Sequence, residues 1–225
     1  MRLAQFGIRL DFAEERRIYT VGQKVYEAIT GEIPSEHEPP YTPGILIRAS
    51  KRKLTTAWNP ERCLIALEDV SDLNKCIETI LITLEQINTV APIYKLSKRN
   101  ISTYWILPAP DYDFPSLEQK YREIMIAQNE ISSLSADSSV IFDIKVGEWT
   151  LHHQSGAMLP EQLLDRYLQF KAADIPKAFL FLEASIEDEK VVEYSSEDTR
   201  NYLVTSLDYC KSHSDAFHRI WEGIL

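Results

Sequence analysis

The spacing of hydrophobic residues alternates along the chain between the period of a strand and that of a helix. Residues 4–12 carry apolar side chains at every second position, as in a strand with one buried face. From about residue 14 the apolar positions recur every three or four residues, which predicts an amphipathic helix that ends near residue 30. Gly31 follows, where many helices end in a left-handed residue. The chain therefore begins with a strand and a helix.

The same two periods predict the elements of the remaining chain. We expect strands at about 45–50, 53–58, 63–68, 93–107, 140–146, 149–154 and 178–186. We expect helices at about 71–90, 115–129, 160–170 and 197–224. Asp69 or Ser71 is expected to cap the first of these helices, and the last has a candidate break near residues 212–214. The proline-rich stretch 32–44 and the serine-rich stretch 132–139 are expected to form loops.

The order of these elements indicates an α+β fold. It reads βαβββαβ and then αββαβα, without the strict βα alternation of a parallel sheet, so we expect antiparallel sheets with packed helices. Residues 1–110 have the pattern of a ferredoxin-like, split βαβ half with one added strand. Residues 111–225 form a second half that either repeats the first in degenerate form or completes one composite domain with it.

Charge separates the two halves. Residues 1–110 hold 14 Lys and Arg against 13 Asp and Glu, a net charge of +1, whereas residues 111–225 hold 10 against 21, a net charge of −11. The acidic half is a poor surface for nucleic acid or anionic lipid and is either a solvated surface or a face for a basic partner. No apolar run is long enough to span a membrane, and charged Arg9 and Asp11 argue against a signal peptide.

Glycine, cysteine and histidine positions argue against several kinds of site. No two of the seven glycines are closer than nine residues, so no phosphate-binding loop is predicted and no cofactor is expected. The three cysteines have no CxxC spacing and are expected to be core residues of a cytoplasmic protein. His152 and His153 would point to opposite faces of a strand, and His213 and His218 are five apart on a helix, so neither pair predicts a metal site. No catalytic residue is assigned.

Two patterns nevertheless resemble functional sites. Asp143 and Lys145 in one strand have the carboxylate-x-Lys spacing of metal-dependent nucleases, which also require a further carboxylate nearby. Basic residues gather in the hairpin near residue 50 and in the strand after residue 93, beside Tyr94, Tyr104 and Trp105. The candidate nucleic-acid-binding residues are Arg48, Lys51, Arg52, Lys53, Lys95, Lys98 and Arg99. The alternative is that the hairpin lysines and arginine are a charged turn that guards an edge strand.

The last helix offers a candidate interface. Its apolar stripe ends in Phe217, Trp221 and Ile224, which would bind a protein partner or a second copy if the chain's own core did not cover them. The stripe, the acidic connection at 187–189 and the preceding apolar strand at 179–182 resemble the C-terminal pattern of a sporadically distributed, functionally uncharacterised bacterial family. That resemblance implies no activity, and the patchy distribution suggests mobile or defence-associated genes.

These observations favour a non-enzymatic, cytoplasmic protein–protein interaction or accessory protein. The first alternative is an accessory protein that binds RNA or single-stranded nucleic acid through the basic hairpin. The second is a metal-dependent nuclease centred on Asp143 and Lys145.

Overall fold

The computed structural model describes residues 1–13, 22–30, 45–49, 53–126, 138–166, 168 and 175–225. The strands are β1 (Arg2–Phe12), β2 (Ile45–Ala49), β3 (Leu54–Trp58), β4 (Arg62–Glu68), β5 (Lys95–Pro108), β6 (Ser139–Val146), β7 (Trp149–Met158), β8 (Phe179–Asp188) and β9 (Val192–Glu193). The helices are α1 (Gly22–Thr30), α2 (Leu73–Val90), α3 (Phe114–Met125), α5 (Pro160–Arg166) and α6 (Ser196–Trp221). The α+β class and the predicted order of elements are confirmed, with β9 as an addition.

All the strands belong to one antiparallel sheet that both halves of the chain build. Its order is β2-β3-β4-β1-β5-β8-β7-β6, and β9 pairs with the start of β5. The first half supplies β1 to β5 and the second half supplies β6 to β9, and the long strands β5 and β8 join them along ten paired positions from Arg99–Asp188 to Pro108–Phe179. The division expected at residue 110 falls in the connection between β5 and α3. The strands on either side of it belong to the same sheet.

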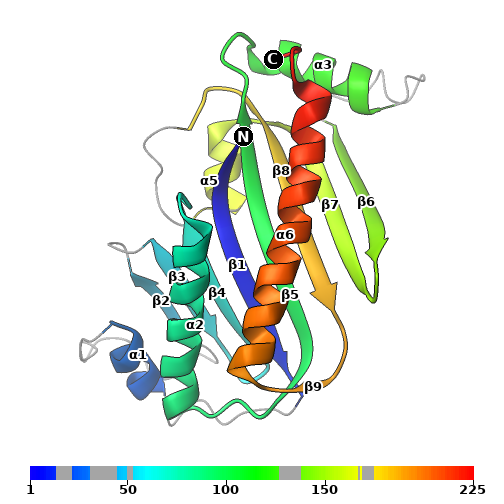
Figure 1. Cartoon of the computed structure of the whole chain (residues 1–225). Helices are drawn as coiled ribbons and strands as arrows, with labels where there is room; N and C mark the ends of the chain where they lie inside the picture. Colours follow the sequence, from blue (N-terminus) through cyan, green and yellow to red (C-terminus); the bar gives the residue numbers. More distant parts are fainter. Residues whose placement is uncertain (14–21, 31–44, 50–52, 127–137, 167, 169–174) are drawn as a thin grey trace.

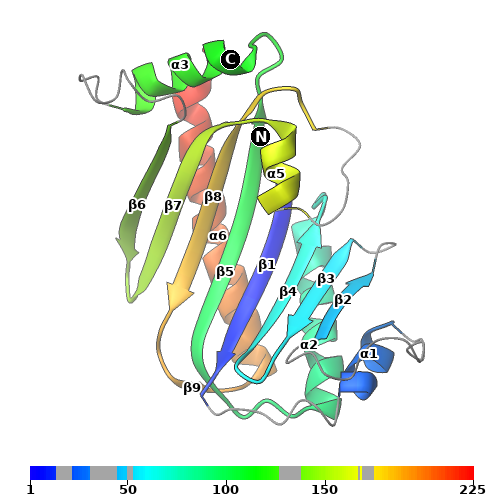
Figure 2. The same ribbon diagram turned by 180° about the vertical axis from the view of Figure 1, so that it is seen from behind.

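Helices cover the two faces of this sheet unequally. Figure 1 shows α2 and α6 lying across one face, and Figure 2 shows the short helix α5 on the other. We call these the helix face and the polar face. On β1 the helix face carries Phe6, Ile8, Leu10 and Phe12, all in the main core, whereas Arg9 and Asp11 alternate with them on the polar face. The alternation that predicted β1 therefore also assigns its two faces.

Local chemistry fixes the ends of the helices. The Asp72 carboxylate accepts a hydrogen bond from Lys75 N at 3.1 Å and caps α2, so the expected cap at Asp69 or Ser71 is wrong by one residue or more. Ser195 caps α6, whose first turn holds Glu197 and Asp198. Acidic residues there are stabilised by the helix dipole.

Several predicted boundaries differ from those of the structure. Strand β7 continues past residue 154 to Met158, because β8 offers pairing partners along its whole length. Helix α6 runs without the break expected near residues 212–214. The Ser214 hydroxyl donates a hydrogen bond to Lys211 O in the preceding turn, and the helix continues through this position. The expected helix at 14–30 is described only from residue 22, and the expected loops at 32–44 and 132–139 lie almost wholly outside the described residues.

Candidate functional site

Strand β6 forms one end of the sheet and exposes apolar side chains on both of its faces. It pairs with β7 along all eight residues, and the sheet order ends there within the described residues. Ile141 on the polar face is 68% exposed, and Phe142 and Ile144 on the helix face are 39% and 37% exposed. The backbone N–H and C=O groups on the outer side of such a strand can pair with another chain.

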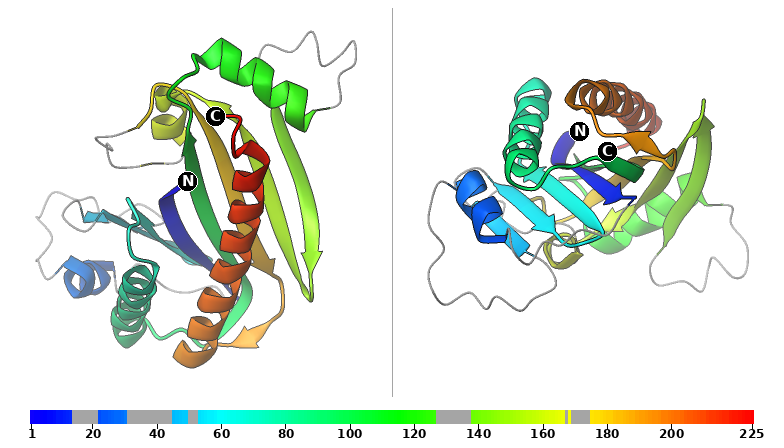
Figure 3. Two further views of the ribbon diagram at one scale, coloured as in Figure 1. Left: turned by 45° about the horizontal axis from the view of Figure 1, so that its top comes forward. Right: turned by 90° about the horizontal axis from the view of Figure 1, so that it is seen from below.

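The helix face of β6 is partly exposed, because α6 lies over β5 and β8 and meets β6 only where His213 contacts Phe142 edge-on, with ring centroids 6.3 Å apart. Helix α6 packs over β5 and β8, so β7 and β6 extend beyond it, as Figures 1 and 3 show. Trp149 at the start of β7 contacts Tyr202 and Tyr209 of α6 edge-on, with ring centroids 5.3 and 6.2 Å apart. Tyr209 is itself 43% exposed. These aromatic side chains therefore lie where the core covered by α6 ends and the partly exposed edge strand begins.

Beneath Phe142 lies a chain of hydrogen-bonded polar side chains. The Tyr121 hydroxyl lies 2.8 Å from both Ser155 O and Ser155 Oγ, and Ser155 Oγ lies 2.6 Å from His153 Nε2. His153 Nδ1 in turn lies 2.7 Å from Nε2 of His213 on α6. Phe142 stacks on the His153 ring, with centroids 4.2 Å apart and planes within 11°. We call Tyr121, Ser155, His153 and His213 the histidine relay.

Burial keeps the two histidines of the relay neutral. Desolvation, and to a lesser extent the nearby His213, lowers the pKa of His153 to about 4, and desolvation also lowers the pKa of His213. One neutral ring donates a proton to the other, and the hydrogen bond survives in either direction of that donation. A proton added to the pair can sit on an outer ring nitrogen and leave this hydrogen bond intact, whereas protonation of both rings would place two N–H groups against each other.

The relay contains the hydroxyl–imidazole contact of a nucleophilic site, but this contact is buried and only His213 at its end is partly exposed. Ser155 and His153 are 1% and 2% exposed, and Tyr121 is fully buried with its pKa raised to about 12, chiefly by desolvation. A nucleophile must reach its substrate. Within the described part of the chain, the relay therefore acts as rigid support beneath Phe142.

Asp143, predicted as the centre of a nuclease site, instead holds a histidine. Its Oδ1 lies 2.6 Å from His152 Nδ1 on the polar face, and Lys145 Nζ donates to Thr150 Oγ1 at 2.7 Å. No three His, Cys, Asp or Glu side chains of the described residues are placed to hold one metal ion. The further carboxylate that the nuclease hypothesis requires is thus missing from these parts of the chain.

The predicted basic residues do not form one patch. Lys53 before β3 is separated from β5 by two strands, β4 and β1, and Arg48 on β2 is separated from it by these two and β3. Lys53 pairs with Asp69, and Lys95 lies 4.0 Å from Glu193. Lys51 and Arg52 lie outside the described residues.

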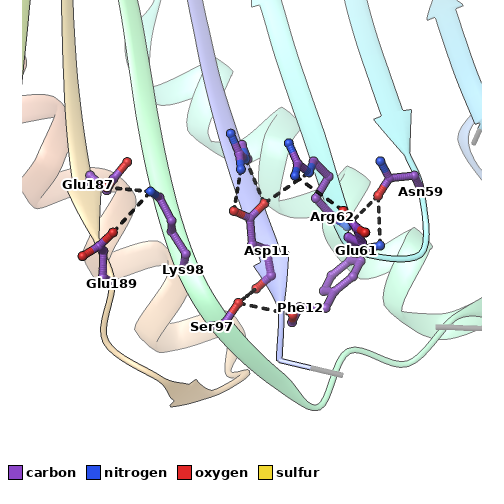
Figure 4. A network of polar contacts seen from close by, with 10 residues as sticks. Asp11, Phe12, Asn59, Glu61, Arg62, Ser97, Lys98, Glu187 and Glu189 are labelled. Atoms are coloured by element: carbon purple, nitrogen blue, oxygen red, sulfur yellow. Dashed lines mark hydrogen bonds and ion pairs between the residues drawn. The ribbon is translucent and has the colours of Figure 1, made fainter. Parts of the chain in front are cut away.

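On the polar face, carboxylates from neighbouring strands neutralise the cations. Figure 4 shows Lys98 of β5 beside Glu187 and Glu189, at 2.6 and 3.5 Å. The same view shows Asp11 of β1 next to Arg62 of β4, with 3.7 Å between the charged atoms. Phosphate binding needs cations that are available to it. The described cations of this face are already paired with carboxylates and are therefore less available to a phosphate.

Arg99 is a core residue of the helix face. It is 5% exposed, its NH2 group lies 2.5 Å from Asp188 Oδ2, and its NH1 group pairs with Asp198 at the start of α6. Its guanidinium carbon also lies 4.4 Å from the centroid of the Tyr202 ring. These contacts anchor α6 to the sheet and leave Arg99 unavailable to a nucleic acid.

The predicted interface on the last helix is largely covered by the chain's own core. Phe217 and Trp221 are 3% and 1% exposed, and Trp221 stacks on Tyr121 with parallel rings 5.9 Å apart. Ile224 is partly buried against the same core, and its carbonyl accepts a hydrogen bond from Tyr112. The apolar stripe therefore serves the fold.

The features that distinguish the site were not assigned from the sequence. The His153–His213 contact joins residues 60 apart, so no local motif marks it. One local signal for the edge strand does exist. On the polar face of β6, the apolar Ile141 stands between Ser139 and Asp143, which is unusual for a strand with one solvated face.

Comparison with known proteins adds little to this geometry. No protein-family model and no curated protein matches the chain. The chain is similar to a solved structure titled Methanococcus jannaschii TBP, at 11% identity over 94% of this chain and 98% of that one, with a TM-score of 0.30. A likeness at that score carries no argument about fold or function. None of the helices in the described ranges has the length and apolar composition needed to cross a bilayer.

Proposed function

We propose that this protein works by binding another protein chain, which adds a strand to the sheet at β6, and that it does not work by catalysis. The observation that carries the proposal is an eight-residue edge strand with exposed apolar side chains on both faces. Partner chains commonly bind in this way, with backbone hydrogen bonds giving affinity and alternate side chains giving specificity.

The contrast with the other edge of the sheet supports the proposal. Strand β2 has five residues and presents exposed Arg48 beside exposed Leu46. Short length and charge are the usual protection of an edge strand against unwanted pairing. Strand β6 is longer and has three exposed apolar side chains, so its edge is less protected. A strand of this kind is a hazard unless a partner covers it.

The surroundings of β6 also favour a pre-organised binding strand. Phe142 is stacked on the buried His153, and Gly147 closes the tight turn to β7 with a φ of +62°, a conformation that suits glycine. A strand already held in its bound conformation loses little entropy when a partner pairs with it. The expectation of a cytoplasmic location belongs to the same proposal and is supported by three cysteines that are all free.

Site-specific photo-cross-linking tests this proposal. A photoreactive amino acid replaces Ile141 on β6 or, as the matched control, Leu46 on β2. Any chain captured only from position 141 is then purified, and its affinity is measured for the wild type, Ile144→Lys and Leu46→Lys. We expect Ile144→Lys to weaken binding and Leu46→Lys to leave it unchanged. Equal capture from both positions, or binding that Ile144→Lys does not affect, would refute the proposal.

A further inference from the structure

We infer that the chain bound at β6 is a second copy of this protein, paired antiparallel about a two-fold axis beside Ile144. This inference rests on the proposed function, because it names the partner for the same edge. It is carried by the order of side chains along β6, in which an axis beside Ile144 pairs opposite charges on one face and apolar side chains on the other.

Sheet geometry limits the registers. A two-fold axis perpendicular to the sheet makes the two β6 strands antiparallel and keeps the helix faces of both copies on the same side. Residues directly opposite each other must then lie on the same face. The axis therefore passes beside a residue and not between two residues, so each candidate register is named by the residue that opposes itself.

Charge selects among these registers. An axis beside Asp143 would place two carboxylates directly opposite each other, which is destabilising. An axis beside Phe142 would place Asp143 against the partner's Ile141 and give the carboxylate an apolar neighbour. An axis beside Ile144 places Asp143 opposite the partner's Lys145, and symmetry makes this ion pair twice. The polar face then carries complementary charges.

The helix face agrees with the same register. An axis beside Ile144 pairs Ile144 with the partner's Ile144 and Phe142 with the partner's Val146. Each of these side chains is apolar, and both Phe142 and Ile144 are partly exposed in the single chain. Pairing would cover them with apolar neighbours, and directly opposed apolar side chains on one face of a sheet stabilise it.

A charge-swap experiment tests both the partner and the register. The mass of the full chain is measured by sedimentation and light scattering for the wild type, for Asp143→Lys, for Lys145→Asp, for an equimolar mixture of these two, and for the double variant. Circular dichroism melting confirms that each variant is folded. We expect the wild type to reach twice the 25.9 kDa of one chain. Each single variant should weaken the dimer at least about tenfold, because it opposes like charges at both symmetric positions.

The mixture and the double variant should restore dimerisation, because both place a lysine opposite a carboxylate again. A wild type that stays monomeric at high concentration overturns the inference, and a different chain captured at position 141 would then still support the proposed function. A dimer that the single variants do not weaken, or that the mixture does not restore, overturns the register and with it the inference. A dimer that reforms in the mixture but not in the double variant would place the axis beside Asp143 or Lys145 and overturn it equally.

Discussion

The buried His153 should make the protein lose stability as the pH falls from about 7 to about 5. The pKa of His153 is lowered to about 4 in the folded protein, whereas a histidine in the unfolded chain titrates near its ordinary value of 6.5. Between these two values the unfolded state binds a proton that the folded state does not bind. Stability from this group is therefore complete above the unfolded value and is lost progressively down to about pH 4.

The magnitude follows from the same two values. Each unit of difference between the folded and unfolded pKa values changes the free energy of unfolding by about 1.4 kcal/mol. The total loss of stability is therefore about 3 kcal/mol, of which about 2 kcal/mol is lost between pH 7 and pH 5. His213, whose pKa is also lowered, acts in the same direction. The Glu183 carboxyl, whose pKa desolvation raises, acts in the opposite direction. A comparison with a variant that lacks only His153 removes the contributions of other groups.

The assay is urea unfolding of the wild type and of His153→Gln, each at about pH 7 and about pH 5. Glutamine keeps a polar group beside Ser155 but does not titrate. We expect the free energy of unfolding of the wild type to fall by about 2 kcal/mol more than that of the variant over this interval. An equal pH dependence in both proteins, or a wild type that gains stability toward pH 5, would refute the reasoning.

Three further outcomes follow from the contacts in the core and on the polar face. Arg99→Met should lower the free energy of unfolding by about 3 kcal/mol, because Asp188 would keep a buried charge without its partner. Lys98→Met at the neighbouring, partly exposed pair with Glu187 should cost at most about 1 kcal/mol, and equal effects of the two substitutions in urea unfolding would contradict this. Tyr121→Phe should cost about 1–2 kcal/mol through the lost hydrogen bonds to Ser155, and a thermal melt identical to that of the wild type would show that the relay adds no stability. Because carboxylates pair with Lys53, Lys95, Lys98 and Arg99, a labelled single-stranded RNA should show no saturable, salt-sensitive binding at low salt, and binding that Lys98→Glu abolishes would favour the nucleic-acid alternative instead.

The local elements of this fold could be predicted because they depend on short-range periodicity. Two patterns in the sequence predicted which side chains contact the core. These are the alternation of Phe6, Ile8 and Leu10 in β1 and the apolar stripe along α2. The order of strands in the sheet depends on pairings between distant segments, such as β1 with β5 and β5 with β8. Apart from the apolar Ile141 at a polar-face position, a single sequence does not show which strand lies at the edge of the sheet, so the exposed position of β6 was not predicted.

The candidate site was missed for the same reason. The predicted basic residues are close along the chain, but Lys98 and Arg99 pair with Glu187 and Asp188, which lie some ninety residues away on β8. The adjacent Lys98 and Arg99 also point to opposite faces of β5, so Lys98 is partly exposed on the polar face and Arg99 is buried under α6. Basic residues that are close in the sequence are therefore not grouped on one surface of the folded protein.

Hydrogen exchange of the β6 amides tests most directly whether a chain binds at this edge. In the single chain, the N–H groups of β6 that do not pair with β7 should exchange rapidly, as they should on the outer side of β2. With the captured partner present, or with the protein itself at high concentration, we expect those β6 amides to slow by at least about tenfold while the outer amides of β2 do not change. Outer β6 amides that exchange at the same rate with and without the bound partner would contradict the account.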